Sequence, residues 1–247
     1  SCVPFIASLA VVLFSGLPMQ TGMGIAFFIN GAWWLLTTVP LLKNYEQIHY
    51  EPRKPHAVAE SFRRLLRVFQ EIRGERKIFL FLIAFFFYID GVYTIIDMAG
   101  FTSTTLLLAL LLTQIVAFPC ALLFGWLAPK YENGTLIRIC IVAYGAIALF
   151  AVQLDKSWEF WFLAVCVGMF QGGIQALSRA YFAKIIPAEK SGEYFGLYDI
   201  FGKGAAFMGT TLVGFGAQLT GSLNIGVSVI FVLFVIGFLL FEKAVRA

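Results

Sequence analysis

The sequence predicts an all-α integral membrane protein with about eight transmembrane helices. Of its 247 residues, 60% are hydrophobic and only 13% are charged, whereas soluble domains carry about 25% charged residues. The mean hydropathy is +0.85. The apolar residues form eight long segments, and the basic residues gather in alternate connections between them. These observations place the chain in the membrane class.

The eight apolar segments, apart from the short first one, are long enough to cross a hydrocarbon core of about 30 Å. They cover residues 3–17, 22–42, 78–98, 104–128, 136–154, 159–183, 196–218 and 224–242. The first segment also contains Pro4, and the chain begins at Ser1 inside this apolar run. We therefore expect part of a longer protein, with a natural short form as the alternative.

The basic residues predict the orientation. Of the 18 Lys and Arg residues, all but Lys156 lie in 43–77, in 129–138, around the sixth and seventh segments, or in the C-terminal tail. These regions share one side if every segment crosses once. Cytoplasmic loops carry an excess of Lys and Arg, so we expect the basic loops and the C-terminus in the cytoplasm. In a bacterium, the membrane would be the cytoplasmic membrane.

The connection 43–77 is the long one, and it contains apolar residues at helical spacing. These are Val58, Phe62, Leu65, Leu66, Phe69 and Ile72. Arginines occupy much of the other side, which predicts an amphipathic helix on the cytoplasmic membrane face. Two interpretations remain, a linker between two helical bundles and a lipid-binding regulatory element.

The third segment carries two aspartates, in the stretch "FFFYIDGVYTIIDMAG" at 85–100. A carboxylate near the bilayer centre costs about 3 kcal/mol on insertion scales. Asp90 and Asp97 are seven residues apart, so they share a helix face and lie about 10 Å apart along it, with Thr94 on the same side. Asp90 lies about 18 Å from Ile78 at the inner boundary, close to the midplane. We expect Asp90 in a binding or coupling pathway, and Asp97 either there or simply at the outer mouth.

Further polar residues lie within the fourth and sixth segments. Gln114 is in the middle of the fourth, and Gln171, Gln175 and Arg179 follow helical spacing along one face of the sixth. They are candidates for the same pathway. Alternatively, the glutamines form hydrogen bonds between helices, and the arginine extends to the cytoplasm.

The sixth and seventh segments also contain features of helix packing and of a cytoplasmic ion pair. Gly168 and Gly172 form a GxxxG pattern, which permits close helix contact. Asp199 and Lys203 are four residues apart near the inner surface, a spacing at which they can pair on one helix face. They form either a surface pair or a latch.

The sequence favours neither an enzyme nor a cofactor-binding protein. Metalloprotease, serine hydrolase and P-loop motifs do not occur. A membrane aspartyl protease needs its two carboxylates on different helices, facing each other. The four cysteines are scattered in apolar runs, and the two histidines form no cluster with them. We therefore expect no metal, nucleotide or other cofactor and no nucleic-acid partner.

Three stretches resemble a known transporter family. "LLFGWLAPKYENG" at 122–134 resembles the major facilitator loop motif, with Gly125 and Lys130 matching, although Pro129 replaces its acidic residue. The stretch 168–214, together with 88–97, resembles the branch related to the autophagy-linked vacuolar amino-acid effluxers, particularly its bacterial permeases. The resemblance implies a twelve-helix, two-half bundle with a midplane site between the halves.

In that arrangement the segments correspond to helices 5–12. Residues 1–42 would be the last two helices of an incomplete N-terminal half. Residues 43–77 would be the central cytoplasmic loop, and 78–247 the complete C-terminal half. The motif residues Gly125 and Lys130 would then join the Asp199–Lys203 pair at a cytoplasmic gate.

The function expected is secondary active transport of a small polar solute by alternating access. The resemblance suggests amino acids as the solute, and Asp90 suggests a proton as the coupling ion. We expect a monomer whose partners are the solute and the lipid bilayer. A membrane receptor or scaffold with the transporter fold, but without transport, is the alternative.

Overall fold

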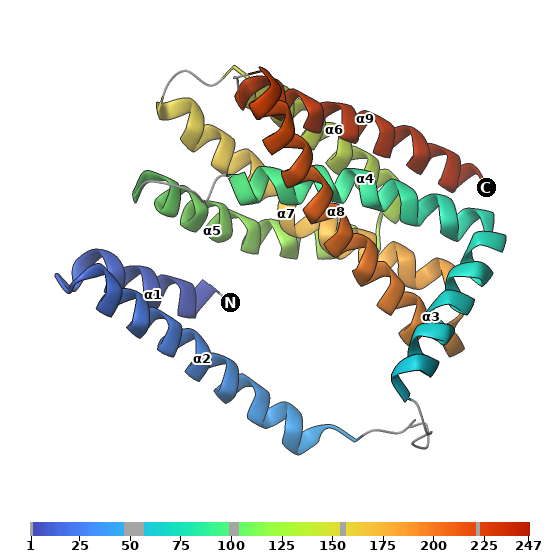
Figure 1. Cartoon of the computed structure of the whole chain (residues 1–247), viewed down its shortest axis with the longest axis horizontal. Helices are drawn as coiled ribbons and strands as arrows, with labels where there is room; N and C mark the ends of the chain where they lie inside the picture. The colour runs from blue at the N-terminus through green and yellow to red at the C-terminus, as the bar shows by residue number, and fades with distance from the viewer. Residues whose placement is uncertain (1, 47–56, 99–103, 154–156, 221–222) are drawn as a thin grey trace. The chain divides into compact units, whose positions relative to one another are not determined.

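The structure is a computed structural model that describes residues 2–46, 57–98, 104–153, 157–220 and 223–247, and all regular secondary structure in these ranges is helical (Figure 1). The chain divides into two compact units, Ser1–Ala57 and Val58–Ala247.

The first unit is a pair of packed helices, α1 (Cys2–Phe14) and α2 (Met19–Asn44). Gly16, with a φ of 65°, provides the left-handed conformation needed in the short connection between them. The Asn30 amide donates a 2.8 Å hydrogen bond to the Ser8 hydroxyl and ties the two helices together. This unit contains two of the predicted membrane segments.

The second unit is a bundle around one central helix. Its elements are α3 (Ala57–Gly74), α4 (Arg76–Met98), α5 (Thr104–Leu127), α6 (Asn133–Ala151), α7 (Ser157–Ile185), the 3-10 turn η1 (Ala188–Lys190), α8 (Ser191–Thr220) and α9 (Leu223–Arg246). α4 packs against α6, α7, α8 and α9, whereas α5 packs on α7. Consequently α4 is mostly buried within the protein, and its aromatic residues Phe81, Phe85 and Tyr88 belong to the core.

Each of the eight predicted segments coincides with a helix, and six of these helices are long and apolar enough to cross a membrane. The two exceptions in the described part of the chain are α1 and α8. The apolar part of α1, Val3–Val12, is short. α8 has sufficient length, but its glycines and the charged Asp199 and Lys203 lower its hydropathy.

Glycines permit close helix contacts at several places in the bundle. A Cβ at Gly168 would lie 2.7 Å from the Thr113 carbonyl oxygen, and one at Gly172 would lie 2.8 Å from the Ala121 Cβ. The GxxxG pattern therefore lies against α5, as its spacing predicts. On the other side of the bundle, a Cβ at Gly237 would lie 3.0 Å from the backbone nitrogen of Tyr88, which brings α9 close to α4.

The amphipathic helix predicted within 43–77 is α3, and it packs on the other helices of the second unit. Val68 and Ile72 are buried in the main core cluster. Phe62 and Leu66, which belong to the same predicted apolar pattern, are exposed. The apolar residues of α3 therefore form two different surfaces.

Candidate functional site

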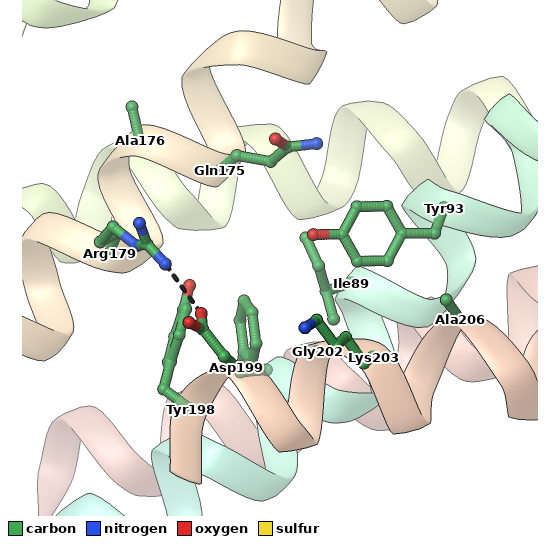
Figure 2. Close-up of a pocket in the computed structure, with 11 residues that line it drawn as sticks. Ile89, Tyr93, Gln175, Ala176, Arg179, Tyr198, Asp199, Gly202, Lys203 and Ala206 are labelled. Atoms are coloured by element: carbon green, nitrogen blue, oxygen red, sulfur yellow. Dashed lines mark hydrogen bonds and ion pairs between the residues drawn. The ribbon is translucent and has the colours of Figure 1, made fainter. Parts of the chain in front are cut away.

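A pocket of about 580 Å³ opens between α4, α7 and α8. Its lining residues are Phe85, Ile89, Tyr93, Gln175, Ala176, Arg179, Tyr198, Asp199, Gly202, Lys203 and Ala206. Figure 2 shows the Tyr93 hydroxyl, the Gln175 amide and the Lys203 ammonium group facing the space between the three helices. The pocket thus combines aromatic walls with a few polar groups, which is typical of small-molecule sites.

The ion pair at this pocket differs from the expected one. Asp199 forms a 2.8 Å ion pair with Arg179, and not with Lys203 (Figure 2). The reason is that α7 and α8 both border the pocket, so that the Arg179 side chain reaches across it. Lys203 has no ion-pair partner among the described residues.

Asp90 is fully buried and lies at a contact between α4 and α8. Its Oδ1 accepts a 2.7 Å hydrogen bond from the Gly209 backbone N–H. Its Oδ2 has no hydrogen-bond partner among the described residues, and the same is true of the buried Thr94 hydroxyl. No basic side chain in the described part of the chain forms an ion pair with Asp90.

The position of Gly209 relates Asp90 to the pocket. A Cβ at residue 209 would collide with the Asp90 carboxylate and the Thr94 hydroxyl, so only glycine permits this approach. Gly209 comes three residues after the pocket residue Ala206, which is about 4.5 Å along the helix axis. Asp90 and Thr94 are not among the lining residues, but they directly follow two of them, Ile89 and Tyr93. They therefore lie beside the pocket on an adjoining face of α4, inside the protein.

The remaining candidates in the spans are dispersed. Gln175 lines the pocket. Gln171, one turn earlier on α7, is half-buried, and its Oε1 has no hydrogen-bond partner among the described residues. Gln114 is half-buried on α5. Asp97 belongs to α4, but its side chain lies outside the described residues.

Gly125 and Lys130 are not among the residues that line the pocket. Gly125 is exposed, and a Cβ there would meet nothing within 4 Å. The Lys130 ammonium group lies 3.2 Å from the centre of the Trp126 ring, a cation–π contact.

Sequence reasoning missed several residues of this region. Tyr93 and Tyr198 contribute to the pocket wall. A buried 2.7 Å hydrogen bond joins the Tyr88 and Ser178 hydroxyls and links α4 to α7. The spacing of Gln171, Gln175 and Arg179 already places Ser178 on the polar face of the sixth segment, but it does not indicate the tyrosine partner. For the tyrosines the signal was a hydroxyl within an apolar run.

The described residues contain no group of three or more His, Cys, Asp or Glu side chains that is suitable for a metal ion. Three of the cysteines, Cys120, Cys140 and Cys166, have free thiols.

Comparison with known proteins shows the family. A profile described as "Vacuole effluxer Atg22 like" matches residues 2–246. The chain belongs to this family. The resemblance inferred from 88–97 and 168–214 is thereby confirmed. The Atg22-like family is one of transporters and not of enzymes, in agreement with the expectation from the motifs.

Relatives of this Atg22-like chain occur in bacteria and fungi. An "Uncharacterized MFS-type transporter YxiO" of Bacillus subtilis is 43% identical over 249 residues, which cover 96% of the chain and 58% of that relative. Autophagy-related protein 22 of Saccharomyces cerevisiae strain YJM789 is 25% identical, with 77% of the chain and 44% of the relative covered. Autophagy-related protein 22-1 of Aspergillus niger is 26% identical, with 77% and 36% covered. The chain thus spans little more than half of the length of the bacterial relative.

Proposed function

We propose that the chain forms part of a major facilitator-type secondary transporter that moves a small polar solute by alternating access. The observation that carries the proposal is the pocket between α4, α7 and α8, in a chain of an effluxer family. Its size suits a small molecule. Its hydroxyl, amide and charged groups suit a polar solute, for which an amino acid is our leading candidate.

In this proposal the three polar regions have different roles. Gln175 and Lys203 bind the solute, and Tyr93 and Tyr198 form the wall against which it packs. The ion pair between Arg179 and Asp199 is a latch that opens and closes between conformations. All eight predicted segments cross the membrane, and the basic loops face the cytoplasm.

Asp90 is the coupling group in this proposal, and the ion it carries is a proton. A buried carboxylate without a cationic partner is costly, and a proton removes this cost. The described oxygens at the site, from Asp90 and Thr94, are too few to enclose a metal cation.

The test uses the full-length protein in proteoliposomes. Amino acids and related metabolites are first screened for thermal stabilisation, and uptake of those that bind is then measured with and without a pH gradient. Asp90→Asn, which retains an oxygen for the Gly209 N–H, should fold normally and lose the dependence of uptake on pH. Unchanged dependence would remove Asp90 from the coupling mechanism.

The pocket is tested separately. Lys203→Gln and Gln175→Leu should weaken solute-dependent stabilisation, whereas Lys184→Gln, an exposed change on α7 outside the pocket, should not. Equal behaviour of the three variants would contradict the assignment of the pocket. Stabilisation by a solute that is never transported would instead identify a receptor with a transporter fold.

A further inference from the structure

The helix α3 lies across one end of the bundle. Figure 1 shows it running across the end at which α4 begins and α9 ends, in a direction transverse to those helices. Helices that cross a membrane place such a transverse helix along the membrane surface. This end carries the basic residues that predict the cytoplasmic side.

One face of α3 is fixed to the bundle. Val68 and Ile72 are buried. On the adjoining side, the Arg64 Nε donates a 2.6 Å hydrogen bond to Glu193, the acidic residue in the first turn of α8. Lys190 forms a 2.7 Å ion pair with Glu71. These contacts determine which residues of α3 point away from the protein.

The surface that points away combines apolar and basic side chains. Phe62 and Leu66 are 66% and 63% exposed and lie one turn apart. Viewed down the helix axis, Arg73 projects in a direction between those of Phe62 and Leu66. Arg63 and Arg67 project further around the helix, on the side away from the bundle. These three arginines are exposed and form no ion pair within the described part of the chain.

We propose that this surface of α3, formed by Phe62, Leu66, Arg63, Arg67 and Arg73, binds the headgroups of anionic phospholipids. Amphipathic helices at the interface insert apolar side chains among the lipids and place basic ones at the headgroups. The guanidinium group matches phosphate geometry and binds it in a bidentate manner. The unpaired positive charges therefore favour an anionic lipid as the occupant over an apolar protein surface.

The consequence concerns α8. Lipid binding stabilises the position of α3, and α3 is attached to the first turn of α8 through Arg64 and Glu193. α8 contributes Tyr198, Asp199 and Lys203 to the pocket. Anionic lipid thus acts on the end of the helix that forms one pocket wall.

The test measures the unfolding temperature of the full-length protein in nanodiscs of phosphatidylcholine, with or without one third phosphatidylglycerol. Phosphatidylglycerol should raise the unfolding temperature of the wild type. The double variant Arg63→Gln/Arg67→Gln should lose most of this increase. The matched control, Lys184→Gln/Lys243→Gln, changes the net charge equally at exposed positions on α7 and α9 and should keep it.

A spin label identifies what covers the apolar pair. It is attached at Leu66→Cys in a background without the native cysteines, and its accessibility to oxygen and to a water-soluble nickel complex is compared. High oxygen and low nickel accessibility place the residue in lipid, as proposed. Protection from both reagents, which indicates a protein partner, would overturn the proposal. So would the absence of any effect of phosphatidylglycerol, or an equal loss in both double variants.

Discussion

The contact between Gly209 and Asp90 leads to a quantitative prediction for Gly209→Ala. The added methyl group would collide with the Asp90 carboxylate and the Thr94 hydroxyl in a fully buried place. Overpacking of this kind costs about 1–3 kcal/mol. The displaced carboxylate also loses its hydrogen bond from the Gly209 N–H, and a hydrogen bond between membrane helices is worth about 0.6–1.7 kcal/mol. We expect a total loss of about 2–4 kcal/mol.

The same helix provides the control. Gly214 also belongs to α8, and a Cβ there would meet nothing within 4 Å. Gly214→Ala therefore experiences the same change in helix propensity, up to about 1 kcal/mol in favour of Ala, without the collision. The difference between the two variants isolates the contact with α4.

The assay is reversible unfolding of both variants in mixed micelles. A third variant, Asp90→Ala, removes the carboxylate, so the cost of Gly209→Ala should fall by at least about 1 kcal/mol in that background. If the two glycine variants agree within about 0.5 kcal/mol, or if Asp90→Ala leaves the cost of Gly209→Ala unchanged, the close approach of α8 to Asp90 is wrong.

Three further predictions concern other contacts of the second unit. Tyr88→Phe removes a buried interhelical hydrogen bond and should lower the free energy of unfolding by about 1 kcal/mol; no loss would contradict the assigned bond. Arg179 and Asp199 are both more than half exposed, so a double-mutant cycle on unfolding should give a coupling energy of less than about 1 kcal/mol, and this energy should decrease as salt is added. A larger coupling energy that does not depend on salt would mean a buried pair. The hydrogen bond to Glu71 raises the pKa of Lys190 above its ordinary value of 10.5. The pair therefore stabilises the protein fully below pH 10.5, and this stabilisation is lost as the pH rises through the pKa of Lys190 in the folded protein. Lys190→Gln should lack this alkaline loss, and an unchanged pH profile of unfolding would refute the pairing.

The helices were predictable because apolar runs and basic connections are properties of the local sequence. The direction of the Asp90 side chain was also predictable in general terms, because a carboxylate within a membrane span must point away from lipid and toward protein or water. Its neighbour Gly209 was not, since 119 positions separate the two residues and one sequence does not specify which helices meet. The role of Asp90 in the transport pathway remains a prediction; the structure places its side chain beside the pocket, on the face of α4 that meets α8.

The ion pair of Asp199 shows the limit of reasoning from spacing. The four-residue interval to Lys203 suggested a pair within one helix. The observed partner, Arg179, lies on another helix, and only the packing of α7 beside α8 reveals it. In α3, likewise, periodicity identified the amphipathic helix but did not separate the buried Val68 from the exposed Leu66.

The polar character of α8 has a consequence for how the protein enters the membrane. A lysine makes the insertion of a helix less favourable, most of all at its centre, and α8 carries Lys203 in its first half together with several glycines. α9, directly after it, is among the most apolar helices of the chain. We therefore expect the translocation machinery to retain α8 until α9 emerges and to release the two as a hairpin. Synthesis that stops after α8 should leave this helix outside the bilayer, and the pocket would then lack one wall.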